Sequence, residues 1–224
     1  MPRVEGKALA PLDPRAWGLY VITDRQQTGG RSLEEVTTSA LAGGARAFQL
    51  REKDLPAREL CRLAELLLGR ARPAGALLLI NDRVDVALGV GADGVHLTRR
   101  SLPPAAVRPL LRPGMCLGVS CHNLEEALEA EAGGADFVLL GPIFPTPAKD
   151  AYGPPAGPAL IRQVRPALAC PVLAVGGITA RNAGEALEAG ADGVAAISAV
   201  MGAPDVTAAT RALLAAVRRA ARPA

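Results

Sequence analysis

Four segments of the sequence share one pattern, a Gly-Ala turn that leads directly into a short apolar run. They begin at Gly43, Gly91, Gly133 and Gly190. Glycine just past a helix end adopts the left-handed conformation that residues with a Cβ avoid. The apolar run that follows is too short for anything but a buried strand. The repeat therefore predicts four helix-to-strand connections, all at the same end of a parallel sheet, and in three of them an Asp supports the turn.

Four further apolar runs lie between these strands, at 18–23, 76–80, 116–119 and 171–175. Ser32 and Asn123 predict helix caps, and Glu126 completes a capping box with Asn123. The expected helices cover roughly 33–41, 58–70, 84–88, 104–111, 124–132, 158–165, 181–189 and 206–221.

Strand and helix thus alternate eight times, which predicts an α/β chain closed as a single (β/α)₈ TIM barrel of parallel strands. An open doubly wound sheet is the alternative. Its dinucleotide-binding form has a GxGxxG turn after the first strand, whereas here the first strand leads into Asp24-Arg25-Gln26-Gln27.

A length of 224 residues suits one such domain, so we expect an N-terminal extension at 1–16 and the barrel at 17–224. Half of the residues are hydrophobic, but only 3% are aromatic, and aliphatic side chains must fill the core.

The net charge of +3 is mild and gives no case for nucleic acid binding. No apolar run approaches the ~20 residues that span a bilayer, and no signal peptide is recognisable, so we expect no membrane association. The four cysteines form no CxxC pair, which favours free thiols in a reducing cytoplasm. Cys116 should begin a strand and Cys121 should follow its end, too far apart to share a zinc ion.

Polar or glycine-rich residues follow every predicted strand at its C-terminal end, where barrel enzymes keep their chemistry. Gln49 and Arg51 are two residues apart, which places both on one face of a buried strand. His96 lies inside an apolar strand, where a satisfied core histidine is the alternative to a functional one. The other residues at these ends include Lys53, Asn81, Asp82, Ser120, His122, Thr146, Lys149, Gly176, Gly177, Ile197 and Ser198.

The chemistry of this set is anion binding. Arg51, Lys53 and Lys149 can bind phosphate oxygens. Gly176 and Gly177 precede a helix that begins near Thr179, which leaves backbone N–H groups bare for a phosphate after the seventh strand, as the turn at Ser198 does after the eighth. Asp82 offers the hard oxygen that Mg²⁺ prefers, so that ion is the expected cofactor. We therefore predict an enzyme that binds one phosphate monoester at the last two strands and a second phosphorylated group at the second and third.

These residues resemble the thiamine phosphate synthase/TenI family from Leu19 to about Ala203. The matching stretches are 19–24 (LYVITD), 49–53 (QLREK), 81–82 (ND), 93–97 (DGVHL), 118–122 (GVSCH), 141–146 (GPIFPT), Lys149 and 176–178 (GGI). The resemblance implies a transferase that joins hydroxymethylpyrimidine diphosphate to a thiazole phosphate and releases pyrophosphate, in thiamine biosynthesis. By analogy with its relatives, which are often oligomeric, a homo-oligomer is a further expectation.

The resemblance also implies roles for individual residues. Gln49 and Ser120 orient the pyrimidine, with His96 nearby, and Asp82 binds Mg²⁺. The diphosphate is held by Arg51, Lys53, Asn81 and Lys149, and the thiazole phosphate by Thr146, Gly177 and Ser198. Gly176 and Ile197 are further substrate-binding residues. The residues closest to catalysis are Arg51, Lys53, Ser120, His122 and Lys149.

Two departures from the family pattern leave the activity open. Ser101 stands where the family has a second acidic Mg²⁺ ligand, after Arg99 and Arg100, and Ala148 replaces a threonine of the phosphate loop. Arg99 and Arg100 either replace the lost charge at pyrophosphate or are solvated loop residues. The first alternative activity is a TenI-type thiazole tautomerase, in which His122 matches the proton carrier. The second is a non-catalytic protein that binds a phosphorylated ligand.

Overall fold

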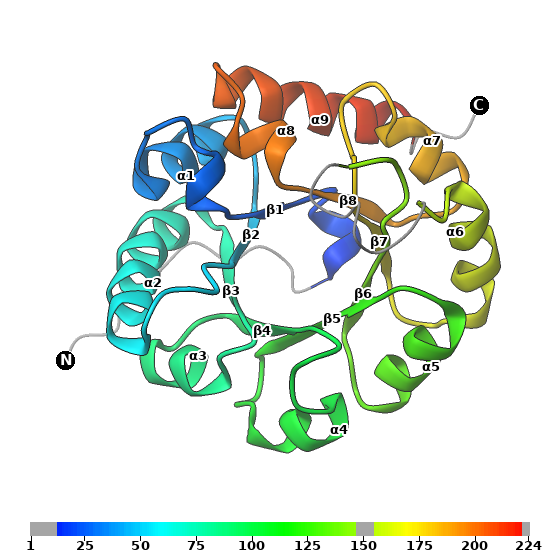
Figure 1. Cartoon of the computed structure of the whole chain (residues 1–224), viewed down its shortest axis with the longest axis horizontal. Helices are drawn as coiled ribbons and strands as arrows, with labels where there is room; N and C mark the ends of the chain where they lie inside the picture. Colours follow the sequence, from blue (N-terminus) through cyan, green and yellow to red (C-terminus); the bar gives the residue numbers. More distant parts are fainter. Residues whose placement is uncertain (1–12, 147–154, 221–224) are drawn as a thin grey trace.

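A computed structural model describes residues 13–146 and 155–220 of the chain. Eight parallel strands form a closed barrel in sequence order, and β8 pairs with β1 to complete the ring (Figure 1). The (β/α)₈ expectation is confirmed. The strands are β1 (Leu19–Ile22), β2 (Ala47–Leu50), β3 (Leu77–Asn81), β4 (Gly94–Leu97), β5 (Cys116–Cys121), β6 (Phe137–Leu140), β7 (Val172–Ala174) and β8 (Gly193–Ala196).

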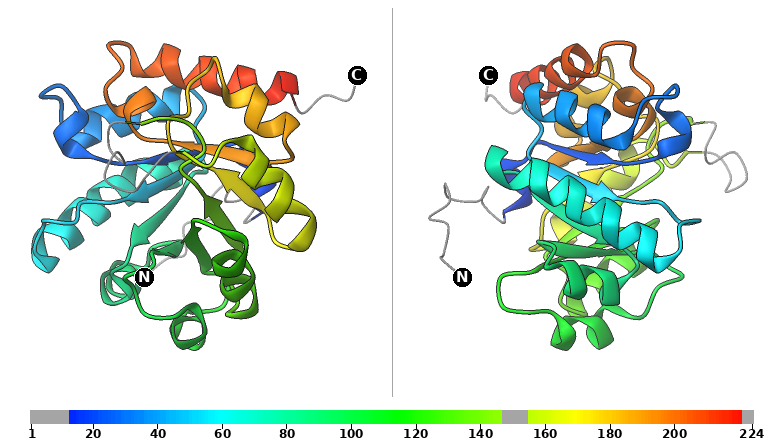
Figure 2. Two further views of the ribbon diagram at one scale, coloured as in Figure 1. Left: turned by 45° about the vertical axis from the view of Figure 1, so that its right-hand side comes forward. Right: turned by 90° about the vertical axis from the view of Figure 1, so that its left-hand side faces the viewer.

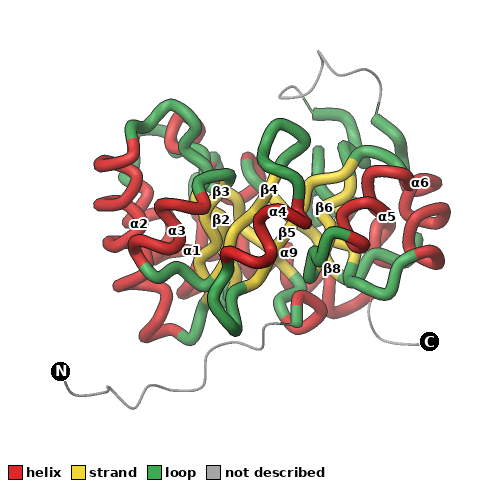
Figure 3. Tube along the Cα trace, turned by 90° about the horizontal axis from the view of Figure 1, so that it is seen from below, coloured by secondary structure: helices red, strands yellow, loops and turns green. Residues whose placement is uncertain are grey.

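Helices surround this ring on its outer side, so that the strands occupy the middle of the molecule (Figures 2 and 3). The α-helices are α1 (Leu33–Ala42), α2 (Ala57–Ala71), α3 (Val84–Val90), α4 (Pro104–Val107), α5 (Leu124–Ala132), α6 (Pro158–Val164), α7 (Ala183–Glu188), α8 (Ser198–Met201) and α9 (Val206–Ala220). Single 3₁₀ turns are η1 (Pro14–Ala16), η2 (Arg25–Gln27), η3 (Arg72–Ala74), η4 (Arg108–Leu110) and η6 (Arg165–Ala167). The last helix, α9, packs against α1 and α7. Among the described residues, no helix combines the length and the apolar character needed to cross a membrane.

Side chains tie neighbouring strands together at the N-terminal end of the barrel. The Asp of three Gly-Ala turns accepts a hydrogen bond from a backbone N–H near the start of the preceding strand. The N···O distances are 2.8 Å for Leu78 to Asp93, 2.7 Å for Leu117 to Asp136 and 2.8 Å for Val172 to Asp192. These carboxylates therefore stabilise the closed sheet, as well as the turns that contain them.

The two predicted helix caps have different outcomes. Ser32 forms a complete capping box, in which its Oγ accepts from the Glu35 N–H at 3.1 Å and the Glu35 carboxylate accepts from the Ser32 N–H at 2.7 Å. Asn123 caps α5 by accepting from the Glu126 N–H, as expected. The prediction of a capping box at this helix is wrong, because the Glu126 carboxylate accepts hydrogen bonds from His122 instead of from the Asn123 backbone.

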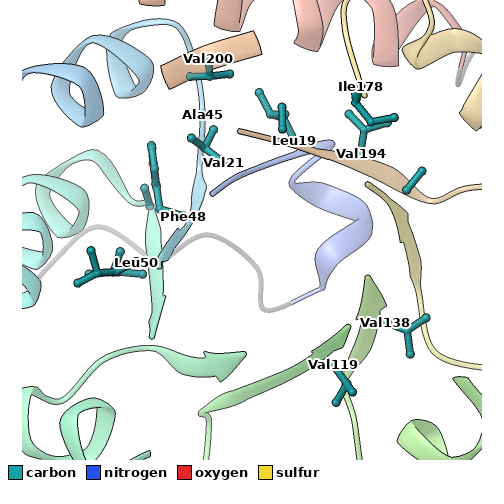
Figure 4. Packing of buried hydrophobic residues seen from close by; sticks show 14 of the residues in the cluster. Leu19, Val21, Ala45, Phe48, Leu50, Val119, Val138, Ile178, Val194 and Val200 are labelled. Atoms are coloured by element: carbon teal, nitrogen blue, oxygen red, sulfur yellow. The ribbon is translucent and has the colours of Figure 1, made fainter. Parts of the chain in front are cut away.

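Apolar side chains fill two separate layers. Alternate strand residues such as Phe48, Leu50 and Val138 point outward and pack under the helices (Figure 4). The intervening residues fill the barrel interior, where aromatic rings contact one another edge-on or tilted. Trp17, which follows η1, meets Phe137 edge-on with ring centroids 5.3 Å apart. Phe137 in turn contacts Tyr20 and His96, at 5.5 and 5.7 Å.

The strand and helix ends differ from the predicted ones in a few places. Strand β5 continues two residues beyond Val119, so Ser120 and Cys121 belong to the strand and do not follow it. Cys116 and Cys121 still lie at opposite ends of β5. A short helix, α8, replaces the predicted turn at Ser198. The end of the predicted N-terminal extension forms η1, whose Pro14 is buried.

We expect Gly118→Ala to destabilise the barrel because the interior has no room for a methyl group there. A Cβ on Gly118 would lie 2.3 Å from Phe137 Cζ and 2.6 Å from His96 Nδ1. Overpacking of this kind costs about 1–3 kcal/mol in the free energy of unfolding, measured by urea denaturation. Gly69→Ala is the matched control, since Gly69 lies in α2 and a Cβ there would have no neighbouring atom within 4 Å. That substitution should stabilise by about 0.5–1 kcal/mol, and equal effects of the two would contradict the packing account.

Candidate active site

A layer of polar side chains lies inside the barrel at the C-terminal end of the strands. Gln49, Asn81 and His96 are all buried, and Asn81 pairs in register with His96 across β3 and β4. Gln49 Nε2 donates to the Tyr20 hydroxyl at 3.3 Å, which leaves its second N–H and its carbonyl oxygen for a ligand. The placement of Gln49, Asn81 and His96 at one end of the barrel agrees with the sequence prediction.

His96 forms a hydrogen bond with Ser120, with Nε2 and Oγ 2.9 Å apart. Complete burial, and then the nearby Arg51 cation, lower the pKa of His96 to about 3, so the ring is neutral near pH 7. Its Nδ1 has no hydrogen-bond partner among the described residues. With the proton on Nε2, His96 donates to Ser120 Oγ, and the Ser120 hydroxyl can donate to an acceptor on a bound molecule. His96 is therefore neither a cation nor a base here, and its geometry fits it to orient Ser120.

Two cationic side chains, Arg51 and Lys53, follow β2 at the barrel mouth. The backbone N–H of Arg51 donates to Thr23 Oγ1 at 2.9 Å, which fixes the start of this loop against β1. Partial burial lowers the pKa of Lys53, and the cations Arg51 and Arg100 lower it further. The effect of Arg100 places this loop residue close enough to act on Lys53 electrostatically. The carboxylate of Asp82 partly offsets these two cations at Lys53. Cations gathered in this way at the mouth suit an anionic ligand.

Asp82 adopts a left-handed backbone conformation, with φ of 64°, the sole positive φ of a non-glycine residue in the described part of the chain. The side chain is exposed. Its backbone N–H donates to the His96 carbonyl at 2.8 Å, so the neighbouring strand holds this conformation. Backbone conformations of this type cost free energy and concentrate at functional sites.

The residues around Asp82 fit a Mg²⁺ ion held by few protein ligands. Asn81 Oδ1 is buried without a hydrogen-bond partner among the described residues, and it adjoins the Asp82 carboxylate in sequence. The described ranges contain no cluster of three His, Cys, Asp or Glu side chains that could hold a metal on their own. Mg²⁺ is commonly held by one or two carboxylates together with substrate phosphates, and this donor set matches that arrangement.

Ser101 closes a turn in the loop after β4. Its hydroxyl accepts from the Thr98 N–H at 2.8 Å, and the Ser101 N–H donates to the Thr98 carbonyl at 2.9 Å. Arg99 extends from this turn toward α5, where its Nη1 lies 3.5 Å from Glu126. Arg99 and Arg100 thus act in different places: Arg99 pairs with an acid of α5, and Arg100 contributes charge at Lys53.

His122 follows β5 and pairs with Glu126 on α5. The Glu126 carboxylate accepts from the His122 N–H at 2.8 Å and lies 2.9 Å from Nδ1. Burial alone would raise the pKa of Glu126, but the hydrogen bonds from His122 hold it below the usual value. Beside this pair, a cavity of about 230 Å³ extends from Ser120 to the β4–α4 loop.

The loops after β6, β7 and β8 meet at the opposite side of the barrel mouth. Gly177, with φ of 63°, lies so close to the preceding loop that a Cβ would be 2.4 Å from the Pro145 carbonyl oxygen. The predicted helix start near Thr179 is wrong, because Asn182 precedes α7 and its Oδ1 accepts from the Thr179 N–H at 2.7 Å. Ile197 connects β8 to α8, and Ser198 is the first residue of α8. Thr146 and Gly176 belong to the loops after β6 and β7. Lys149 and Ala148 lie outside the described residues.

Comparison with known proteins identifies the family. The model of the TMP-TENI family, thiamine monophosphate synthase, matches residues 19–200. The chain belongs to the thiamine monophosphate synthase family. A relative from Geobacter sulfurreducens is 53% identical over 199 residues, which cover 89% of this chain and 93% of the relative. The thiamine-phosphate synthase of Roseiflexus castenholzii is 50% identical over 87% of this chain and 86% of its own. A solved structure, thiamine phosphate pyrophosphorylase from Pyrococcus furiosus, superposes with a TM-score of 0.84 at 42% identity and covers 92% of this chain and 98% of its own.

Sequence reasoning did not find one network of this thiamine monophosphate synthase family barrel. Glu52 is buried beneath the mouth and accepts hydrogen bonds from the Thr23 hydroxyl and from Arg25. The only signal in the sequence is the alternation of charge in Arg51-Glu52-Lys53-Asp54, which does not reveal that Arg25 binds the two acids.

We expect Asp82→Gly to separate stability from ligand binding. Glycine adopts the left-handed conformation without a Cβ penalty, so the free energy of unfolding should stay constant or rise by up to about 1 kcal/mol. The loss of the carboxylate should weaken the Mg²⁺-dependent binding of pyrophosphate about tenfold or more, measured by isothermal titration calorimetry. Asp82→Asn is the control: it removes the charge and retains a side chain that tolerates this conformation. Unchanged pyrophosphate binding in both variants would show that Asp82 has no part in the site.

Proposed function

We propose that this protein couples hydroxymethylpyrimidine diphosphate to thiazole phosphate, with release of pyrophosphate. The observation that carries the proposal is the pair Arg51 and Lys53, cations without an ion-pair partner in the described ranges, beside the polar layer of Gln49, His96 and Ser120. A molecule with an aromatic amine and a diphosphate matches both halves of this site. The names of the Roseiflexus and Pyrococcus relatives point to the same reaction.

In this proposal the polar layer orients the pyrimidine ring. Gln49 has a free N–H and a carbonyl oxygen, so it can both donate to a ring nitrogen and accept from an amino group. Ser120, held by neutral His96, supplies a further donor. Because these groups lie on strands of a closed barrel, they are fixed before the substrate binds.

The cations stabilise the leaving group. The bond between the pyrimidine methylene carbon and the diphosphate oxygen breaks, and pyrophosphate leaves with the electron pair. The thiazole nitrogen then donates its lone pair to the methylene carbon, which forms the new C–N bond. Arg51, Lys53 and Lys149 lower the barrier by electrostatic stabilisation of the negative charge that develops on the diphosphate, and no protein nucleophile is required. Mg²⁺, held by Asp82 and by substrate oxygens, would supply further positive charge at the diphosphate when bound.

The thiazole phosphate would bind where the loops after β6, β7 and β8 meet. The backbone N–H groups of Gly177 and Ile178 donate no hydrogen bond to any of the described residues. The first N–H groups of α8, at Ser198 and Ala199, likewise lack acceptors within the helix. Thr146 and Gly176 complete this predicted phosphate site, which the (β/α)₈ fold commonly places after its last two strands. A homo-oligomer and a cytoplasmic location stay expectations.

A coupled assay tests the proposed reaction. With both substrates and Mg²⁺ present, we expect equal amounts of thiamine phosphate and pyrophosphate. Lys53→Gln should lower kcat/KM by about 10²-fold or more, because it removes charge from the leaving-group site. Arg70→Gln, a change in an exposed pair with Glu34 on the outer helices, is the control and should leave the rate unchanged. The absence of pyrophosphate release above background from the wild-type protein would refute the proposal.

His122 and Glu126 favour one second candidate, the isomerisation of a thiazole phosphate carboxylate to its aromatic tautomer. The Glu126 carboxylate lies 2.9 Å from Nδ1 of the half-buried His122, which orients the ring. Such a histidine can move a proton near neutral pH. The cations at β2 are not required for this reaction, so we rank it below the synthase.

Replacement of His122 distinguishes the two reactions. If the protein is a tautomerase, His122→Ala should slow the isomerisation by about 10²–10⁴-fold, followed by the change in absorbance of the thiazole. Glu126→Gln should slow it less, since it leaves the imidazole in place. Glu125→Gln, at an exposed position of the same helix that does not line this cavity, is the control. An isomerisation rate that is unaltered in His122→Ala would exclude this role.

A further inference from the structure

A buried acid separates in sequence the two cations of the proposed diphosphate site. Glu52 separates Arg51 from Lys53 in sequence, yet its side chain is only 2% exposed. Its Oε1 accepts from the Thr23 hydroxyl at 2.7 Å, and both of its oxygens accept from the Arg25 backbone N–H at 3.2 Å. The same Thr23 hydroxyl oxygen accepts from the Arg51 N–H. Glu52 therefore connects the loops after β1 and β2 through Thr23.

One guanidinium neutralises this carboxylate together with the next acid of the loop. Arg25 Nη1 lies 3.1 Å from Glu52 Oε2, and its two Nη atoms each donate to a different oxygen of Asp54 at 2.6 Å. The fork on Asp54 is bidentate, the strongest arrangement of this kind of pair. Arg25 accordingly holds the pKa of Asp54 below its usual value, and Asp54 and then Glu52 raise the pKa of Arg25.

Glu52 and Asp54, the acids on both sides of Lys53 in sequence, are thus already bound by Arg25. In the described ranges, no ion pair includes Arg51 or Lys53. The sequence alone would favour the opposite result, because the residues that flank Lys53 are acidic and could pair with the two cations. Arg25 removes that competition from outside the loop.

We propose that Arg25 is a positioning residue, which binds Glu52 and Asp54 so that Arg51 and Lys53 stay available for the phosphate groups of a ligand. The proposal rests on the proposed function for the identity of that ligand. The role of Arg25 can be tested without turnover, because the proposal concerns the affinity of the site for a diphosphate. Without the Arg25 side chain, Asp54 would be freed, and Glu52 would keep its hydrogen bonds to Thr23 and to the backbone N–H but lose its compensating charge. Both carboxylates would then attract the two cations and repel an anionic ligand.

Binding of inorganic pyrophosphate, measured by isothermal titration calorimetry with Mg²⁺ present, tests this role. Arg25→Gln should raise the Kd by about tenfold. The triple variant Arg25→Gln/Glu52→Gln/Asp54→Asn removes the competing charges and should restore the Kd to within about threefold of wild type. Rescue of this kind is expected of an electrostatic role, and loss of fold would not produce it. In the coupled assay, Arg25→Gln should raise the KM for the diphosphate substrate more than it lowers kcat.

Arg25→Gln leaves a buried carboxylate without its cation and could unfold the protein, so a milder second variant is included. Arg25→Lys keeps the charge and loses the fork, so it should raise the Kd by about threefold, and Asp54→Asn in that background should reverse the effect. Arg70→Gln, at the exposed pair with Glu34, is the matched control and should not change the Kd.

Three results would overturn the proposal: an unchanged Kd in folded Arg25→Gln, a raised Kd that the triple variant does not restore, or no binding of pyrophosphate by the wild-type protein. A wild-type protein that binds pyrophosphate but forms no thiamine phosphate would refute the proposed function alone. The Kd series would then still decide the role of Arg25.

Discussion

The closed hydrogen-bonded ring of parallel strands is the constraint on which the rest of this protein depends. Pairing of β8 with β1 uses the strand backbone groups for the ring itself, and it brings all eight C-terminal strand ends to one mouth. Recognition of a ligand is therefore left to side chains and loop backbone at that mouth. The carboxylates of Asp93, Asp136 and Asp192 strengthen the ring at the other end, where they bind the preceding strands. The two ends thus divide stability and chemistry between them.

Sequence reasoning predicts this division because both of its signals are local. A Gly-Ala turn marks the N-terminal end of a strand, and a polar residue after an apolar run marks the other end. Those signals suffice to place Gln49, Asn81, His96 and Ser120 at the mouth, and the structure brings them together there. They also predict the parallel barrel, since strands that alternate with helices leave few other arrangements.

What the sequence could not predict depends on partners that are distant in the chain or on competition between nearby ones. Glu126 has the spacing of a capping-box acid, yet its carboxylate binds His122, because a charged hydrogen bond to a partly buried imidazole is available in the folded structure. Ser101 stands where the family has an acid, and only the structure shows that its hydroxyl closes a turn with Thr98. Arg25 and Glu52 are 27 residues apart, and only the adjacency of β1 and β2 makes them neighbours. The start of α7 differs from the predicted one for a similar reason, since the Asn182 side chain caps the Thr179 N–H in the loop.

Aromatic rings inside the barrel connect the single tryptophan to the polar residues at the mouth. The chain has one tryptophan, and Trp17 is buried at the closed end, in contact with Phe137 and Tyr20. Tyr20 reaches Gln49 by its hydroxyl, and Phe137 touches the ring of His96. Two aromatic side chains thus separate the indole from the residues that would meet a substrate. All tryptophan fluorescence of this protein therefore originates from one buried environment, which is connected to the mouth through Tyr20 and Phe137.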